Sequence, residues 1–163
     1  MDAAANNSAS SKPGPSLKGR ALRLLAGRDY GRIELERKLA PHADSAEQMA
    51  QVLDDLQAKG FISDERAAAS LLHRRADKLG QARLLQELRH KGFDADLIAS
   101  QAALLQETEE NCLKTVWQKK FIQAPQDAAE KAKQMRFLAS RGFAPGLISK
   151  WMRSLGAGAA DEE

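Results

Sequence analysis

The chain has 163 residues, a formal net charge of +3 at pH 7, and 43% hydrophobic but only 5% aromatic residues. Its apolar residues are mostly Leu and Ala, which favour helices, whereas the strand formers Val and Tyr are nearly absent. No apolar run reaches the roughly 20 residues of a membrane helix, no signal-peptide pattern opens the chain, and the single cysteine, Cys112, excludes an internal disulfide. We therefore expect an all-α, cytoplasmic protein.

The first 16 residues are small, polar and interrupted by Pro and Gly, so we expect a disordered leader over 1–16. After it, apolar residues recur three and four positions apart in nine segments, which is the spacing of one helix face. The segments are separated by Gly, Pro or N-capping residues. These nine predicted helices are 17–26, 32–40, 46–59 (with Asp44 or Ser45 as N-cap), 64–79, 81–91, 94–106, 108–122, 125–141 and 145–155. An acidic flexible tail is expected over 156–163.

Three of the predicted helices end in a Gly-Phe pair, namely Gly60-Phe61, Gly92-Phe93 and Gly142-Phe143. A glycine just after a helix commonly takes the left-handed conformation, and the apolar residue that follows packs back onto the last turn. We interpret the pairs as helix caps. They are not part of a nucleotide-binding loop, because the chain contains no GxGxxG or GxxxxGK[ST] sequence.

A short pattern, in which a leucine is followed three positions later by a basic residue, recurs along the chain. Its copies are Glu34-Leu35 with Lys38, Glu87-Leu88 with Lys91, and Phe137-Leu138 with Arg141. A period of about fifty residues indicates a duplicated structural unit. The nine helices then form three tandem three-helix repeats, over 17–62, 63–106 and 107–155. Repeats of this size are marginally stable alone, so we expect them to dock in series into an elongated, curved body.

The chain carries no recognisable catalytic or metal-binding pattern. Its three histidines stand far apart in sequence, and none has the HExxH or HxxxH spacing of a metal site. Cys112 and Trp117 occur at core spacing on a predicted helix, which favours a packing role for both. We therefore expect neither enzymatic activity nor a cofactor.

Basic residues concentrate in three segments that alternate with acidic ones. On the predicted helix over 81–91, Arg83, Arg89 and Lys91 lie away from the leucine stripe. Lys and Arg displayed in this way suit phosphate backbones or an acidic groove on a protein. The plain alternative is a set of solvated helix surfaces.

Four segments together resemble the RecX family of bacterial regulators of the RecA recombinase. In chain order they read ALRLLAGRDYGRIELERKLA, VLDDLQAKGFISDERAAASLL, GQARLLQELRHKGFDADLI and FLASRGFAPGLISKWM. The middle two are the most specific, and the resemblance extends over 17–155. The chain departs from the family pattern at Gly31, where a serine cap is commoner, and at Ala68 or Ala69, where an aromatic residue is usual.

The resemblance implies three three-helix repeats and a monomer that lies in the groove of the RecA filament on single-stranded DNA. It further implies inhibition of ATP hydrolysis, strand exchange and co-protease activity, and direct DNA binding by some members. The basic surface of the second repeat is the first candidate for contact with RecA or DNA, and basic residues of the other repeats come next. These candidates are Arg74, Arg75, Lys78, Arg83, Arg89 and Lys91, then Arg32, Lys38, Arg136 and Arg141.

Two other functions stay open from the sequence. Three-helix units with short turns and a basic second helix also occur in helix-turn-helix regulators of duplex DNA. Against this, the helix over 81–91 offers few Asn or Gln side chains for reading bases, although Arg83 and Arg89 suit guanine. A helical scaffold for another protein is the third possibility.

Overall fold

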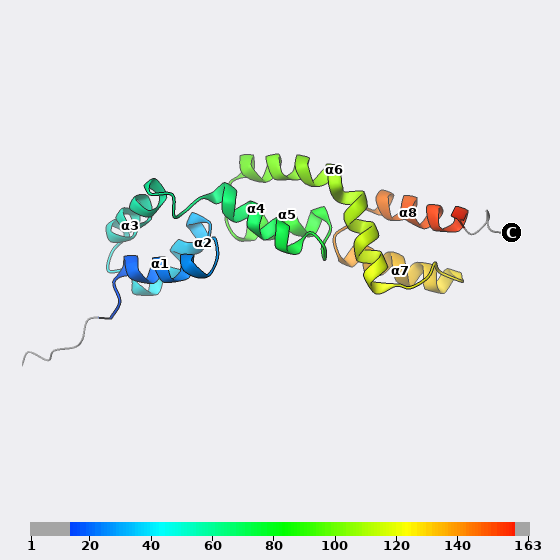
Figure 1. Cartoon of the computed structure of the whole chain (residues 1–163), viewed down its shortest axis with the longest axis horizontal. Coiled ribbons are helices and arrows are strands. Elements are labelled where there is room, and N and C mark those ends of the chain that lie inside the picture. The colour runs from blue at the N-terminus through cyan, green and yellow to red at the C-terminus, as the bar shows by residue number, and fades with distance from the viewer. Residues whose placement is uncertain (1–13, 159–163) are drawn as a thin grey trace, which may run out of the picture.

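The computed structural model describes residues 14–158, which fold into eight α-helices and one short 3-10 helix (Figure 1). The elements are α1 (Leu17–Gly27), α2 (Arg32–Leu39), a 3-10 helix (Ala40–His42), α3 (Ala46–Ala58), α4 (Asp64–Arg75), α5 (Gln81–His90), α6 (Ala95–Lys120), α7 (Ala128–Ser140) and α8 (Pro145–Gly158). The all-α class is confirmed. Most of the expected leader lies outside the described residues, and Gly156 to Gly158, expected in the tail, continue α8.

The helices follow one another as three repeats along an elongated body (Figure 1). Repeat 1 is α1 to α3, repeat 2 is α4, α5 and the first half of α6, and repeat 3 is the second half of α6 with α7 and α8. The expected count of nine helices differs by one, because α6 is continuous over 26 residues. The segment around the expected boundary at 107 reads LLQETEEN, which lacks Gly and Pro, so nothing in it ends the helix.

Each repeat encloses a separate small core, consistent with three short units arranged in series. Leucine supplies most of the fully buried side chains, and within residues 14–158 the buried side chains form three separate clusters. The completely buried side chains include Leu35, Leu39, Leu53 and Leu56 in repeat 1, Leu84 and Leu88 in repeat 2, and Leu113, Leu138 and Ile148 in repeat 3. Small separate cores make each repeat depend on its neighbours for stability.

The Gly-Phe pairs end α3, α5 and α7 as expected. Gly60, Gly92 and Gly142 all have positive φ, and each following Phe N–H donates to a carbonyl of the last helical turn. The fates of the phenyl rings differ. Phe93 and Phe143 are 8% and 3% exposed, whereas Phe61 is 49% exposed. Phe93 and Phe143 each follow the second helix of a repeat, and the preceding repeat packs against the end of that helix. Phe61 follows the third helix of its repeat, where no such contact is made within the described part of the chain.

In the structure, α2 and α5 correspond in a register that differs by one helical turn from the register that the short sequence pattern predicts. Both helices begin after a glycine N-cap that makes no side-chain bond, and both bury leucine at their fourth and eighth residues. Leu35 therefore corresponds to Leu84, whereas the short sequence pattern matches it to Leu88. The same shift places Arg83, not Glu87, at the position that Glu34 occupies in repeat 1.

Repeats 1 and 2 meet where the start of α2 packs against the turn that ends α5. A Cβ atom on Gly31 would lie 2.8 Å from the Phe93 ring, so a serine there would collide with it. A Cβ on Gly92 would lie 2.7 Å from Ile33. The first free N–H of α2, on Arg32, donates to the Asp64 carboxylate of α4 at 2.8 Å. Repeat 2 therefore caps a helix of repeat 1.

Repeats 2 and 3 use the same docking with still closer backbones. The Gly80 N–H donates to the Arg141 carbonyl at 2.6 Å, and the Ala82 N–H donates to the Gly142 carbonyl at 3.2 Å. The first N–H groups of a helix and its last carbonyls lack partners within their own helix. Here the end of α7 satisfies the start of α5, so the repeats are joined through main-chain groups.

The start of α7, the second helix of repeat 3, has a polar cap of its own. The Asp127 side chain accepts from the Glu130 N–H at 2.8 Å, and the Glu130 carboxylate accepts from the Gln126 N–H at 2.7 Å. This pair is a variant of the capping box, in which Glu130 binds the N–H of the residue before the N-cap. The glycine N-caps of α2 and α5 thus occur where another repeat docks on the start of the helix. At the start of α7, where no repeat of the described chain docks, polar side chains bind the free N–H groups instead.

Candidate functional site

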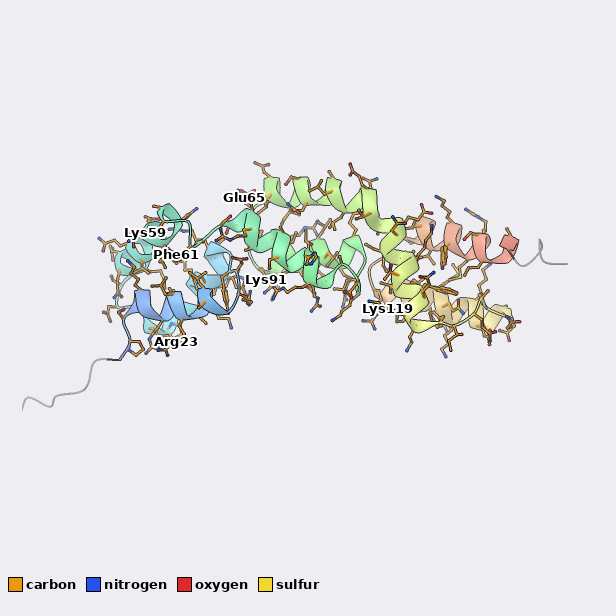
Figure 2. The ribbon with its side chains drawn as sticks, in the orientation of Figure 1. Arg23, Lys59, Phe61, Glu65, Lys91 and Lys119 are labelled. Carbon is orange, nitrogen blue, oxygen red and sulfur yellow. The ribbon has the colours of Figure 1, made fainter. Side chains whose placement is uncertain are left out.

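The six basic candidates of repeat 2 lie on or just after α4 and α5, and all of them except Lys91, which Figure 2 labels, are exposed. Arg75 forms an ion pair with Glu87 at 2.7 Å, and the Arg74 Nε donates to the Ser70 carbonyl of its own helix. Within residues 14–158, the remaining exposed cations of this group form no ion pair; they are Lys78, Arg83 and Arg89.

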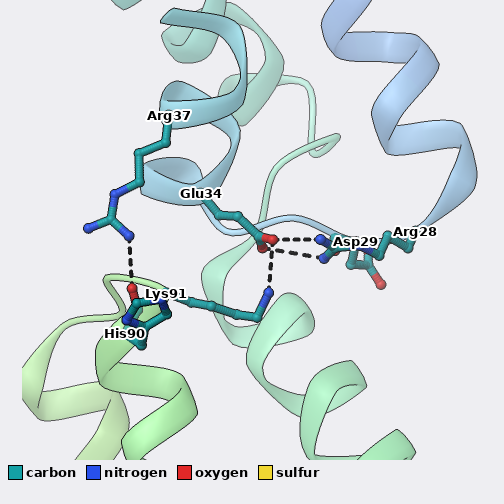
Figure 3. A network of polar contacts seen from close by, with 6 residues as sticks. All are labelled: Arg28, Asp29, Glu34, Arg37, His90 and Lys91. Carbon is teal, nitrogen blue, oxygen red and sulfur yellow. Dashed lines mark hydrogen bonds and ion pairs between the residues drawn. The ribbon is translucent and has the colours of Figure 1, made fainter.

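Lys91, the sixth candidate, takes part in the contact between repeats 1 and 2 (Figure 3). Its Nζ lies 2.9 Å from a carboxylate oxygen of Glu34, and Arg28 forms two hydrogen bonds with the same carboxylate. The Arg37 guanidinium also donates to the His90 carbonyl at 2.8 Å. Lys91 is thus held by an ion pair across the repeat boundary, and Glu34 binds both Arg28 of its own repeat and Lys91 of the next.

The Glu34 side chain is only 12% exposed, so its charge depends on these partners. Burial raises the pKa of Glu34, but the hydrogen bonds and charges of Arg28 and Lys91 outweigh burial and bring the pKa below its ordinary value of 4.5. A lowered pKa in the folded state contributes stability that is fully present above the unfolded pKa. That stability is lost as the pH falls below 4.5 and through the folded pKa.

Replacing Glu34 by glutamine is expected to destabilise the protein by about 2 kcal/mol at neutral pH, because two partly buried cations lose their carboxylate. Urea unfolding at about pH 7 and about pH 3 measures the effect. The difference between wild type and Glu34→Gln should shrink at the lower pH, because the stability contributed by a carboxyl with a lowered pKa declines as the pH falls below 4.5. Glu36→Gln, on the exposed face of α2, is the matched control. A difference that stays constant with pH would contradict the assigned role of the charge.

Candidates outside repeat 2 divide into held and exposed side chains. Arg32 forms an ion pair with Asp54 at 2.6 Å and a hydrogen bond with Gln57 at 2.7 Å, so it braces α2 against α3. Lys38 is exposed at a groove of about 420 Å³ between repeats 1 and 2. Arg136 is exposed on α7.

A second groove, of about 270 Å³, lies between repeats 2 and 3, and we call it the junction groove. It brings together Lys78 and Arg141, two candidates from different repeats, and adds two cations from the end of α6. Apolar side chains line it together with the cations and a single carboxylate. The lining residues are Asp77, Lys78, Val116, Lys119, Lys120, Phe137 and Arg141.

The junction groove has an excess of positive charge. Of the cations that line it, only Lys119 has an ion-pair partner among the described residues, namely Asp77 at 2.9 Å. The hydrogen bond from Lys119 lowers the pKa of the Asp77 carboxyl, which is therefore ionised at neutral pH. Lys120 and Arg141 stand over the Phe137 ring at 5.7 and 5.0 Å from its centroid.

Sequence reasoning did not select Lys119 and Lys120, although a signal for them was present. They form an adjacent basic pair in VWQKKF, inside the most strongly basic segment of the chain. Their importance depends on Lys78, which lies some forty residues earlier along the chain, and on Arg141 at the end of the next helix, α7. A surface assembled from three separate segments leaves no pattern in any one of them.

Two family models match this chain, and the matched segments cover the second and third repeats. Residues 63–100 match the second three-helix domain of RecX, and residues 107–152 match the third. The regulatory protein RecX of Leptothrix cholodnii is 48% identical over 145 residues, which cover 89% of this chain and 92% of the relative. This chain belongs to the RecX family. The resemblance seen in the sequence is thereby confirmed.

Other RecX relatives and solved RecX structures agree with this membership. Regulatory protein RecX of Ralstonia pickettii is 44% identical over 83% of this chain and 85% of the relative. That of Chromobacterium violaceum is 44% identical over 92% of this chain and 95% of the relative. The crystal structure of RecX from Lactobacillus salivarius has a TM-score of 0.73 at 22% identity, and covers 86% of this chain and 95% of the other. The fold is therefore a RecX fold.

The family models place the second and third RecX domains on either side of the middle of α6. Residues 101–106, between the two matched segments, are helical here and join the domains without a loop. Across residues 14–158, no helix has the length and apolar character needed to cross a membrane. The same residues include no group of three or more His, Cys, Asp or Glu side chains arranged to hold a metal ion.

Proposed function

We propose that this RecX-family protein is a negative regulator of RecA that binds in the groove of the RecA filament on single-stranded DNA. By occupying the groove it inhibits the ATPase, strand-exchange and co-protease activities of the filament. The observation that carries this proposal is the extended row of three docked repeats, each with exposed cations on its surface (Figures 1 and 2). A filament presents the same protomer repeatedly, and an extended body can contact more than one of them.

Binding to several protomers at once supports tight association without any large single contact. When one repeat is bound, its neighbours are held at a high effective concentration near the next protomer. The continuous helix α6 supports this role, because it holds repeats 2 and 3 together while both engage. We propose that the protein acts as a monomer in the cytoplasm. The capping box at the start of α7 supports the monomer, since it occupies the docking position that a further repeat would use.

The alternative, a helix-turn-helix regulator of duplex DNA, has less support. Such a protein inserts the N-terminal residues of its recognition helix into the major groove. In this chain Gly80, at the start of α5, is buried against repeat 3, and its N–H is bonded to the Arg141 carbonyl. The start of α2 is covered in the same way by Phe93. Helices α2 and α5 would have to separate from the next repeat before they could read base edges.

ATP hydrolysis by RecA on single-stranded DNA, titrated with this protein at physiological salt, tests the proposal. We expect inhibition at protein concentrations below that of RecA, because one protein molecule bound in the groove contacts several RecA protomers. Inhibition by coating the DNA would need enough protein to cover the whole strand. Full inhibition only at concentrations that saturate the DNA, or none with RecA loading verified, would reject the proposal.

A charge-reversal pair identifies the surface involved. Lys38→Glu with Arg89→Glu changes two exposed cations that form no ion pair within residues 14–158. We expect the concentration for half-inhibition to rise by about tenfold or more, through weaker association with an anionic partner surface. The control is Lys59→Glu, an exposed cation at the end of α3 that pairs with Asp55 of its own helix. Equal inhibition by both variants would place the contact elsewhere.

A further inference from the structure

We propose that the junction groove between repeats 2 and 3 is a docking site for an acidic protein segment that carries an apolar side chain. The proposal goes beyond the regulation of RecA and does not depend on it. It rests on three features of the groove: its unbalanced charge, its apolar lining and the way in which its aromatic ring is already occupied.

The charge of the groove stands out when the two repeat boundaries are compared. Between repeats 1 and 2, the Glu34 carboxylate lies between Arg28 and Lys91 and binds both. The corresponding positions between repeats 2 and 3 are held by Arg83, equivalent to Glu34, and Arg141, equivalent to Lys91. At the position of Glu34 a carboxylate is thus replaced by a cation, while the position of Arg28 is taken by Asp77, which is engaged with Lys119.

The groove itself supplies too little negative charge to compensate. Lys78, Lys120 and Arg141 line it without an ion-pair partner among the described residues, and Asp77 is engaged with Lys119. Carboxylates form strong, charge-assisted hydrogen bonds with ammonium and guanidinium groups. A ligand that brings two or more carboxylates would therefore pair with these cations, as Glu34 pairs with Arg28 and Lys91 at the other boundary.

The remaining lining is apolar and of limited size. Val116 and Phe137 form its apolar wall, and the aliphatic stems of the lysines extend that wall. Its volume of about 270 Å³ lies below the roughly 300–1,000 Å³ of sites for small molecules and cofactors. A space of this size suits one or two apolar side chains, flanked by acidic residues that reach the cations.

The placement of Phe137 favours a peptide over single-stranded nucleic acid. Nonspecific single-strand binding depends on aromatic rings whose faces are free to stack on bases. The Phe137 ring is half-buried, packs edge to face with Phe121 at 5.4 Å, and has Lys120 and Arg141 over it. The ring therefore contributes an apolar wall but no open stacking platform.

Fluorescence anisotropy with two labelled peptides tests the inference. One peptide has a Leu-Phe pair flanked by two aspartates on each side, and the other replaces that pair by Ser-Ser at the same charge. We expect the full-length protein to bind the Leu-Phe peptide about tenfold more tightly than the Ser-Ser peptide, because only the former fills the apolar wall. Lys120→Glu with Arg141→Glu should lower the affinity for the Leu-Phe peptide by at least about tenfold.

Matched variants keep the test sharp. Lys131→Glu with Lys133→Glu changes two exposed lysines of α7 outside the junction groove, and should leave peptide binding unchanged. If the double reversal in the groove unfolds the protein, Lys120→Gln alone should still reduce binding. Equal affinity for both peptides would overturn the inference, since nonspecific attraction between opposite charges would then account for the binding. Binding of a short oligothymidylate that requires Lys120 and Arg141, without peptide binding, would also overturn it in favour of a nucleic-acid groove.

Discussion

Replacing Gly80 by alanine is expected to destabilise the protein by about 3 kcal/mol or more and to separate repeat 3 from repeat 2. The added Cβ would lie 2.5 Å from the Gly142 carbonyl carbon, 2.6 Å from its oxygen and 2.6 Å from the Phe143 nitrogen. All three are backbone atoms, so no side-chain rotation relieves the collision. The two main-chain hydrogen bonds donated by Gly80 and Ala82 would be lost as the repeats move apart.

Thermal unfolding and amide hydrogen exchange measure this effect. For a chain of this length, each kcal/mol corresponds to roughly 2–4 °C in Tm, so we expect a drop of at least about 6 °C. Exchange at the Gly80 and Ala82 amides should become faster than in wild type. Gly146→Ala is the control, because a Cβ there meets no atom within 4 Å and alanine favours the helix. If Gly80→Ala unfolds at the wild-type temperature, the docking of repeats 2 and 3 has been assigned incorrectly.

Placing proline at residue 108 is expected to break α6 and cost about 3 kcal/mol or more, because it removes a backbone donor and collides with the carbonyl one turn earlier. Thr108 lies inside the continuous helix, on its exposed side. The break should disconnect two repeats that α6 now holds in one orientation. We expect lower helicity by circular dichroism, a changed radius of gyration in solution scattering, and new proteolytic cleavage near residue 108.

Thr108→Ala separates the loss of the helix from the loss of the side chain. The Thr108 hydroxyl donates only to the Leu105 carbonyl of the same helix, so alanine should be neutral or slightly stabilising. The nine-helix arrangement expected from the sequence makes the opposite prediction for proline. With a loop between two helices near residue 107, proline at 108 would fall at a helix start and be tolerated. Wild-type stability of Thr108→Pro would therefore favour two helices over one.

Much of the architecture follows from short-range patterns that are readable in the sequence. Leucines at helical spacing predict the helices, and the Gly-Phe pairs predict the ends of three of them, because both depend on residues within about one turn. The spacing of the copies identifies a repeating unit, and four segments identify the RecX family, as the comparisons confirm. The break expected near residue 107 is the exception, since a mere shift in apolar pattern does not end a helix that lacks Gly and Pro.

The all-α class, the three repeats, the glycine caps and the concentration of basic residues are readable from the sequence alone. Which cations are held and which are exposed depends on the folded arrangement, as Lys91 against Glu34 and Lys78 beside Arg141 illustrate. The two kinds of feature differ in the distance along the chain between the residues that interact. Helices and caps form between neighbours in sequence, whereas the ion pairs and the junction groove form between residues some forty to sixty positions apart. Their partners are determined by how the repeats dock, and that docking depends on the close approach of the next repeat to Gly31 and Gly80, where no side chain intervenes.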